Sequence, residues 1–173
     1  MAIETDILQQ LQRSAMSVPG WSSLGDLLSS SRSPTGVHLA VLVEPYLEYI
    51  LQHKKTVESR FSMHCIAPYR RIVKDDVVLL KATAGPVVGC FRAAWVECLE
   101  LDEERLTSIR LRYSEAICAD DAFWYSRTEK RYVTLVGVKQ PQHLPPVRIA
   151  KSDRRGWIVL RSARQTVAQL SLL

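Results

Sequence analysis

The chain has 173 residues, of which 47% are hydrophobic, and a formal net charge of +5 at neutral pH. This length suits one domain with room for an appendage, and the hydrophobic share excludes a wholly disordered chain. The longest uncharged apolar stretch, residues 37–43, is far shorter than the roughly 20 residues that a membrane-spanning helix needs, so no membrane partner is expected. Glu4 and Asp6 stand where a signal peptide carries basic residues, and a cytoplasmic location is therefore expected.

Cysteine and histidine spacing argues against a metal site. The four cysteines are Cys65, Cys90, Cys98 and Cys118, with no CxxC pair among them, and the four histidines are scattered. Zinc normally recruits closely paired ligands, so we expect no metal and no cofactor. In a reducing compartment such thiols are most simply small apolar core residues.

Residues 1–36 are predicted to form a helical extension followed by a linker. Apolar residues at helical spacing predict one helix near the N-terminus and a second short helix after Ser23, before a serine-rich run with Pro34 and Gly36. Because isolated short helices are marginally stable, we expect both to pack on the main domain. An alternative role for this extension is to bind a protein partner.

From residue 37 onward, strand and helix signals alternate. Short apolar or alternating runs predict strands at His38–Val43, Thr56–Phe61, Val77–Leu80, Val87 to about Leu99, Tyr132–Val138 and Trp157–Leu160. Amphipathic spacing predicts helices after Pro45, after Asp102 and after Asp120 or Asp121. The connection after residue 138 is expected to be irregular because it contains Pro141, Pro145 and Pro146. The sum is an α+β fold, a small β-barrel of about five or six strands decorated by helices.

The positive charge is concentrated near the C-terminus. Residues 139–173 hold seven basic residues and one acidic residue, whereas residues 1–138 hold 16 basic and 17 acidic residues. Such a patch attracts polyanions, because each phosphate contact releases condensed counterions. The alternative is an ordinary solvated surface. We expect a main domain over 37–160 and a basic tail over 161–173.

The junction between a helix and a strand at His53–Arg60 carries the most specific signal. A strand places residues i and i+2 on one face, so Glu58 and Arg60 should emerge together beside Lys55 at the helix exit. Arginine offers a donor fork to phosphate or base acceptors, and glutamate accepts from exocyclic amino groups. The three side chains can therefore grip a polar planar ligand. The alternative is a solvent-facing strand with a Glu–Arg salt bridge.

This junction resembles the ASCH-domain signature GxKxxExR. Lys55, Glu58 and Arg60 match its three polar positions, while His53 replaces its glycine, whose expected role is to end the helix with positive φ. The resemblance covers roughly residues 37–160 and implies a PUA-like barrel that presents these side chains at its mouth. It further implies binding of RNA or of a modified nucleoside or nucleotide in a cleft beside the barrel, with DNA as an alternative partner.

The same resemblance implies a second class of function, because some ASCH domains are enzymes. One group hydrolyses N4-acetylcytidine and others are linked to RNA cleavage, so an amidohydrolase or a ribonuclease is the alternative to a binding module. In the amidohydrolases a lysine and a threonine three residues later belong to the catalytic group. Lys55 matches that lysine, but Glu58 occupies the threonine position. In an enzyme, Lys55 and Glu58 are the expected catalytic residues.

Five further residues are candidates for contact with a nucleotide. Lys81 closes a buried strand and can point into the same cleft. Lys151, Arg154 and Arg155 crowd the turn before Trp157, where basic residues beside an aromatic ring suit backbone contact and base stacking. The alternative for Trp157 is a core anchor at the start of a strand.

Overall fold

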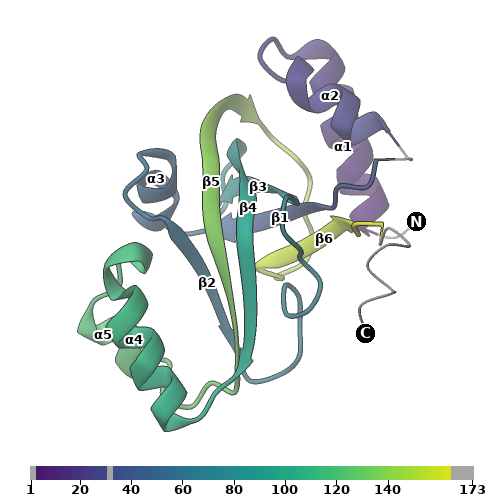
Figure 1. The fold of residues 1–173 in the computed structure, drawn as a ribbon. Coiled ribbons are helices and arrows are strands. Elements are labelled where there is room, and N and C mark those ends of the chain that lie inside the picture. Colours follow the sequence, from purple (N-terminus) through teal and green to yellow (C-terminus); the bar gives the residue numbers. More distant parts are fainter. Residues whose placement is uncertain (1–2, 31–32, 165–173) are drawn as a thin grey trace.

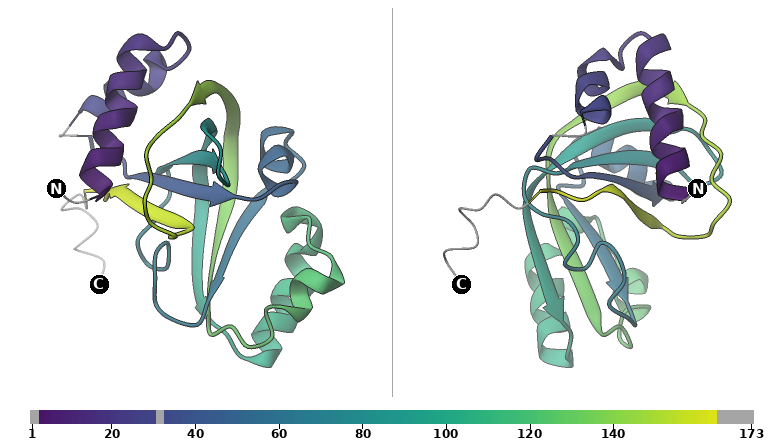
Figure 2. Two further views of the ribbon diagram at one scale, coloured as in Figure 1. Left: turned by 180° about the vertical axis from the view of Figure 1, so that it is seen from behind. Right: turned by 90° about the vertical axis from the view of Figure 1, so that its right-hand side faces the viewer.

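The computed structural model describes residues 3–30 and 33–164 and is built around one six-stranded sheet (Figure 1). The strands are β1 (Val37–Leu42), β2 (Val57–Ser62), β3 (Val77–Ala82), β4 (Val87–Glu100), β5 (Tyr132–Val147) and β6 (Trp157–Arg161). Their order across the sheet is β2-β5-β4-β3-β1-β6, with β1 and β3 parallel and every other pair antiparallel. The sheet curls into a half-barrel, as Figure 2 shows, which confirms the expected α+β class.

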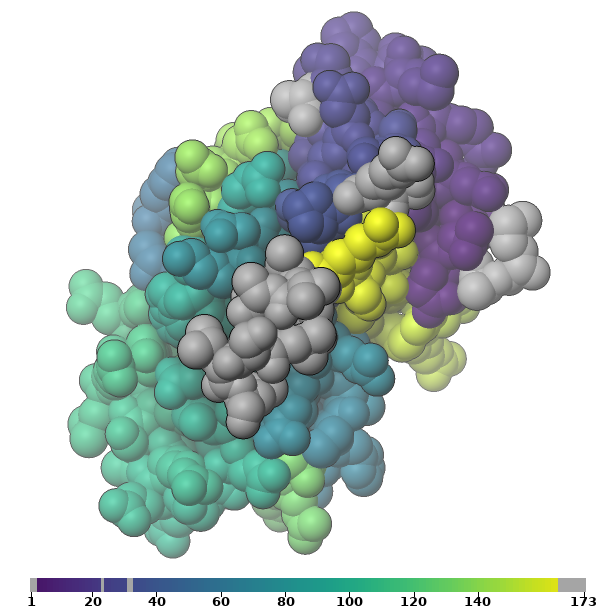
Figure 3. Space-filling view, turned by 45° about the vertical axis from the view of Figure 1, so that its right-hand side comes forward, coloured from purple at the N-terminus to yellow at the C-terminus, as the bar shows by residue number. Residues whose placement is uncertain are grey.

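Helices cover the sheet in two groups. They are α1 (Ile3–Ser17), α2 (Ser22–Ser29), α3 (Tyr46–Leu51), α4 (Glu103–Ile117) and α5 (Asp121–Tyr125). The apolar sides of α1 and α2 share a core with β1, β3 and β6, and Figure 3 shows the purple N-terminal helices against the yellow strand β6. Helices α4 and α5 share a separate core with β2 and β5. The apolar side of the N-terminal extension is therefore buried within this chain.

Strands β1 and β3 are almost wholly apolar because both of their faces are covered. Leu39 and Leu79 belong to the core beneath α1 and α2, whereas Ala40 and Leu80 belong to the core inside the curled sheet. A strand covered on both faces loses the alternation of polar and apolar residues that marks a half-buried strand. No helix in the described part of the chain is both apolar enough and long enough to traverse a bilayer.

The predicted irregular connection after residue 138 is wrong, because β5 continues through all three prolines to Val147. On one side β5 pairs with β2 only as far as Gly137. On the other side it stays paired with β4 as far as Val147, with several register shifts. A proline lacks only its own N–H donor, so it is tolerated where that side of the strand has no partner and at bulges.

The expected tail begins inside a strand. Arg161 is the last residue of β6, and its guanidinium donates to the carbonyl oxygens of Leu27, Ser30 and Thr35. Its positive charge therefore fastens the N-terminal extension to the sheet. Most of the predicted tail, residues 165–173, lies outside the described residues.

Candidate functional site

The backbone that delivers the three candidate residues turns sharply after α3. His53 has a φ of 62°, in the left-handed region, and its N–H donates to the Ile50 carbonyl at 3.0 Å. The N–H groups of Lys54 and Lys55 then both donate to the Tyr49 carbonyl, at 2.8 and 2.9 Å. This confirms the expectation that position 53 ends the helix with positive φ, as the glycine of the signature would.

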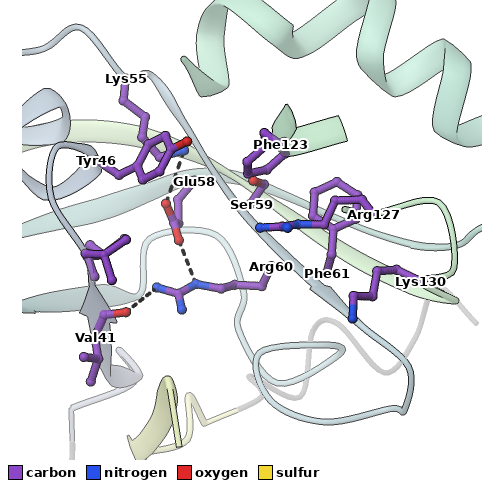
Figure 4. A pocket seen from close by; sticks show the side chains of 12 residues that line it. Val41, Tyr46, Lys55, Glu58, Ser59, Arg60, Phe61, Phe123, Arg127 and Lys130 are labelled. Atoms are coloured by element: carbon purple, nitrogen blue, oxygen red, sulfur yellow. Dashed lines mark hydrogen bonds and ion pairs between the residues drawn. The ribbon is translucent and has the colours of Figure 1, made fainter. Parts of the chain in front are cut away.

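Lys55, Glu58 and Arg60 form one linked network (Figure 4). The Glu58 Oε2 lies 3.4 Å from the Lys55 Nζ, and the Glu58 Oε1 accepts from the Arg60 Nε at 2.7 Å. Lys55 and Glu58 are almost fully buried, at 3% and 2% exposure, whereas the Arg60 side chain is 22% exposed. The carboxylate therefore holds both cations in place, and Arg60 is the member most accessible to a ligand.

Two features stabilise the buried ammonium group of Lys55 besides Glu58. Its Nζ donates to the Ile117 carbonyl at 3.0 Å, in the last turn of α4, where the helix dipole favours a cation. It also lies 5.5 Å from the centre of the Tyr46 ring. Burial nevertheless lowers the pKa of Lys55, and the charge of Glu58 opposes that shift only in part.

Lys55 is therefore expected to lose its proton at lower pH in the folded protein than in the urea-unfolded chain. The unfolded state then binds more protons between the two pKa values, so this group makes stability rise with pH in the interval below about 10.4, the usual lysine value. NMR titration of the Lys55 side chain in both states measures the difference. Glu58→Gln should lower the folded-state pKa further, and equal folded and unfolded values would contradict the prediction.

Arg60 bridges the open side of the curled sheet. It lies on the edge strand β2, and its Nη2 and Nη1 donate to the carbonyls of Val41 and Gly156 at 3.1 and 3.3 Å. Its guanidinium carbon is 5.2 Å from the centre of the Trp157 ring. Because Val41 and Gly156 belong to the region around β1 and β6, Arg60 ties the two ends of the sheet together at the mouth of the half-barrel.

The network lies in the wall of a cleft with a volume of about 440 Å3. Four basic side chains and one carboxylate line it, together with three aromatic rings and the end of β1. The lining residues are Val41, Leu42, Val43, Tyr46, Lys55, Glu58, Ser59, Arg60, Phe61, Phe123, Arg127 and Lys130. The volume falls in the range of about 300–1,000 Å3 that is typical of small-molecule sites. The sequence-predicted trio thus shares one recess and is not scattered over open surface.

Five aromatic or basic side chains of the lining were not among the candidates from the sequence. Tyr46 comes from α3, Phe61 from β2, and Phe123, Arg127 and Lys130 from α5 and the turn that leads to β5. Arg127 and Lys130 belong to the run SRTEKR, which also contains Glu129. They lie in the part of the chain, residues 1–138, where acidic residues balance the basic ones, so net charge does not mark them. Only the packing of α4 and α5 beside β2 brings them to the cleft.

The other predicted contact residues do not line this cleft. The Lys81 Nζ donates to the Gly85 carbonyl at 2.6 Å and to that of Ala82. Lys81 does not line the recess, so the expectation that it points there is wrong. It lies on the central strand β3, where burial and, to a smaller extent, the positive charges of Lys151 and Arg148 lower its pKa.

The basic turn before β6 is largely neutralised by ion pairs. Asp153 pairs with Lys151 at 2.6 Å and with Arg155 at 2.5 Å, and Arg155 also reaches Glu4 of α1 at 2.7 Å. Arg154 is exposed, and no ion pair to it is seen among the described residues. The net positive charge around this turn is therefore smaller in the folded protein than the C-terminal sequence alone suggests, because Glu4 lies beside it.

Trp157 is a core anchor. It is 4% exposed, and its Nε1 donates to the His38 Nδ1 at 3.2 Å. A ring so deeply buried offers no open face for stacking a base, and the partly exposed Arg60 lies over it. Of the two alternatives for this residue, the geometry supports the structural one.

Within residues 3–30 and 33–164, no three His, Cys, Asp or Glu side chains come together as a metal ion would require. The polar groups of the cleft are cations and one carboxylate that is already paired, which is the composition expected for an anionic or hydrogen-bonding organic ligand.

A curled mixed sheet, with a lysine, a glutamate and an arginine delivered to its mouth by a helix–strand unit, is the arrangement that the resemblance to the ASCH signature implied. The chain is similar in structure to the ASCH protein from Zymomonas mobilis, with a TM-score of 0.58 and 15% sequence identity over 72% of this chain and 87% of that one. Crystal structures of two point mutants of the same protein give TM-scores of 0.57 at 15% and 16% identity, with 90% and 88% of those chains covered. The chain therefore has the ASCH-domain fold, as the resemblance implied.

The sequence itself matches no protein-family model and no curated protein. The likeness is thus one of fold, and the chemistry of the site follows from the residues of this chain.

Proposed function

We propose that the protein binds RNA, or a modified nucleoside or nucleotide, in the cleft of Figure 4. The observation that carries this proposal is the lining of the cleft, where four cationic side chains and three aromatic rings surround one recess. Nucleotides combine a flat base, which stacks on aromatic rings and arginine planes, with an anionic phosphate. DNA is the alternative ligand of the same chemistry.

Arg60 and Glu58 are the residues proposed to meet the base. The guanidinium of Arg60 keeps donors beyond those used by Glu58, Val41 and Gly156, since an arginine carries five N–H groups. Each carboxylate oxygen of Glu58 has a second lone pair that can accept from an exocyclic amino group. Lys55 holds the Glu58 carboxylate in place through their 3.4 Å ion pair.

RNA binding is expected to weaken steeply with salt, and Arg154→Glu should flatten that dependence. Each phosphate contact adds roughly 0.7 to the steepness of log K against log salt for a single strand, so loss of one contact should lower it by about that amount. Arg154 is exposed, and it is the arginine of the basic turn for which no ion pair is seen among the described residues. Fluorescence polarisation with a labelled single-stranded RNA at several salt concentrations measures the slope.

Arg112→Glu is the matched control for this measurement. Arg112 is an equally exposed arginine, but it lies on α4, at the opposite side of the molecule from β6 in Figure 1. It should leave the slope unchanged. RNA that does not bind, or that binds with no dependence on salt, would count against the proposed function.

A hydrolase is the second candidate. It is favoured by the position of Lys55 beside Glu58 and by its burial, which lowers the pKa of the lysine. A lysine of this kind can polarise a carbonyl or exist partly neutral, and Glu58 is then the general base for water. N4-acetylcytidine is the discriminating substrate. Turnover that is lost in both Lys55→Ala and Glu58→Ala would favour catalysis, and absence of turnover at high protein concentration would favour binding alone.

A further inference from the structure

We propose that Arg127 and Lys130 form a phosphate-binding site at one end of the cleft, so that the protein takes a phosphorylated nucleotide in preference to the free nucleoside. This inference rests on the proposed function and adds to it the chemical class of the ligand and its orientation. Neither residue belongs to the ASCH signature, and both enter the cleft from the segment between α5 and β5.

Arg127 is held by aromatic rings rather than by a carboxylate. Its guanidinium carbon lies 4.3 Å from the centre of the Phe123 ring and 6.0 Å from that of Phe61. Its Nη1 donates to the Ser126 hydroxyl. Stacking of this kind fixes the plane of the guanidinium while leaving its edge free to donate to a planar or tetrahedral anion.

Among the described residues, no ion pair is found for either Arg127 or Lys130. Both side chains are half-buried in the lining of the cleft, and Figure 4 shows both on the same side of it, beside Phe61. Burial lowers the pKa of Arg127, which reflects the loss of water around its charge. Two partly desolvated cations without a counter-ion make a positive potential that an anion of the ligand would neutralise.

The charge at the opposite end of the cleft is already compensated in part, because one carboxylate pairs with its two cations. Lys55 and Arg60 both pair with Glu58, and Lys55 also donates to the Ile117 carbonyl at the end of α4. A phosphate has less to gain there, and Glu58 would repel it. The phosphate therefore goes to Arg127 and Lys130, and the base goes to Arg60 and Glu58.

The aromatic rings lie between these two ends. Phe123 is 5.9 Å from Phe61 and 6.3 Å from Tyr46, measured between ring centres, and all three line the cleft. Such rings provide the apolar contact that the sugar and the base require, so one nucleotide can satisfy both ends at once.

The test compares the four common ribonucleosides with their 5′-monophosphates by isothermal titration calorimetry. At least one monophosphate should bind about tenfold or more tightly than its nucleoside, since hydrogen bonds between charged groups contribute enough for such a factor. Arg127→Met and Lys130→Met should each reduce this preference, and the double variant should abolish it. Binding of the nucleoside should change by less than about threefold, because the base end is intact.

Arg112→Met is the matched control, since Arg112 also stacks on an aromatic ring, with its guanidinium carbon 5.1 Å from the centre of the Tyr113 ring, but does not line the cleft. It should retain the full preference for monophosphates. If Arg127→Met fails to fold, Lys130→Met decides the result, because Lys130 is not in the core.

The outcomes separate the two proposals. Equal affinities for nucleosides and monophosphates, or an unchanged preference in the double variant, would overturn the phosphate site and leave the proposed function standing. No binding of any nucleoside, monophosphate or single-stranded RNA would overturn both.

Discussion

Glu58→Gln is expected to lower the free energy of unfolding by about 3 kcal/mol or more and to remove ligand binding. The carboxylate is 2% exposed and is the shared counter-ion of Lys55 and Arg60. A neutral amide leaves the buried ammonium group of Lys55 without its counter-ion, which is far more costly than the loss of an exposed ion pair. Chemical denaturation monitored by circular dichroism measures the change.

The loss of stability in Glu58→Gln should depend on pH in a defined direction. Burial already lowers the pKa of Lys55, and removal of Glu58 lowers it further. At pH values below this pKa the uncompensated charge is present in the folded state, and as the pH rises the lysine becomes neutral and the penalty shrinks. Glu129→Gln, an exposed glutamate in the turn before β5, should change stability by less than about 0.5 kcal/mol at any pH.

A double variant separates the fold from the site. In Lys55→Met/Glu58→Met the buried pair is replaced by apolar groups, and such replacements are often neutral or stabilising. We expect this variant to be more stable than Glu58→Gln but equally unable to bind the ligand. Recovery of binding in the double variant would show that the pair has no part in recognition, and wild-type stability of Glu58→Gln would contradict the account of its burial.

The parts of the site that could be predicted from sequence are those fixed by local geometry. The relative positions of Lys55, Glu58 and Arg60 follow from one helix end and the two-residue period of one strand, and His53 adopts the backbone conformation that the pattern requires. No long-range packing is needed to bring these side chains together, so eight consecutive residues carry the information.

The parts that could not be predicted depend on contacts between distant segments. Arg127 reaches the cleft only because α5 packs beside β2, and Arg155 is neutralised in part by Glu4, which lies 151 residues away in the chain. A count of charge along the sequence therefore located the basic surface at the C-terminus, whereas the structure gathers four basic side chains in the cleft. Pairing on one side only likewise explains why β5 runs through its prolines.

A second buried carboxylate, that of Asp76, is connected to Arg60 through His38 and Trp157. Its side chain accepts from the N–H groups of Gly36 and Val73 at 2.7 and 2.9 Å, and its Oδ2 lies 3.0 Å from the His38 Nε2. Since the Trp157 Nε1 can only donate, the His38 Nδ1 must accept from it, and the histidine proton is therefore on Nε2, pointing to Asp76. The chain of contacts then continues from Trp157 to Arg60.

Asp76→Ala is accordingly expected to lower the free energy of unfolding by about 3–5 kcal/mol. Asp76 is 1% exposed, so its loss leaves two backbone N–H groups and the His38 ring without an acceptor in the core. Urea denaturation at fixed pH measures the effect.

Asp75→Ala supplies the matched control, one residue away. Asp75 is exposed and its carboxylate lies 3.5 Å from the Lys139 Nζ, a distance at which surface pairs contribute roughly 0–1 kcal/mol. Equal destabilisation by the two substitutions would mean that the bonds of Asp76 do not stabilise the fold. A large loss confined to Asp76→Ala, accompanied by weaker nucleotide binding, would connect the buried network to Arg60, because the ring on which that arginine lies is oriented through His38.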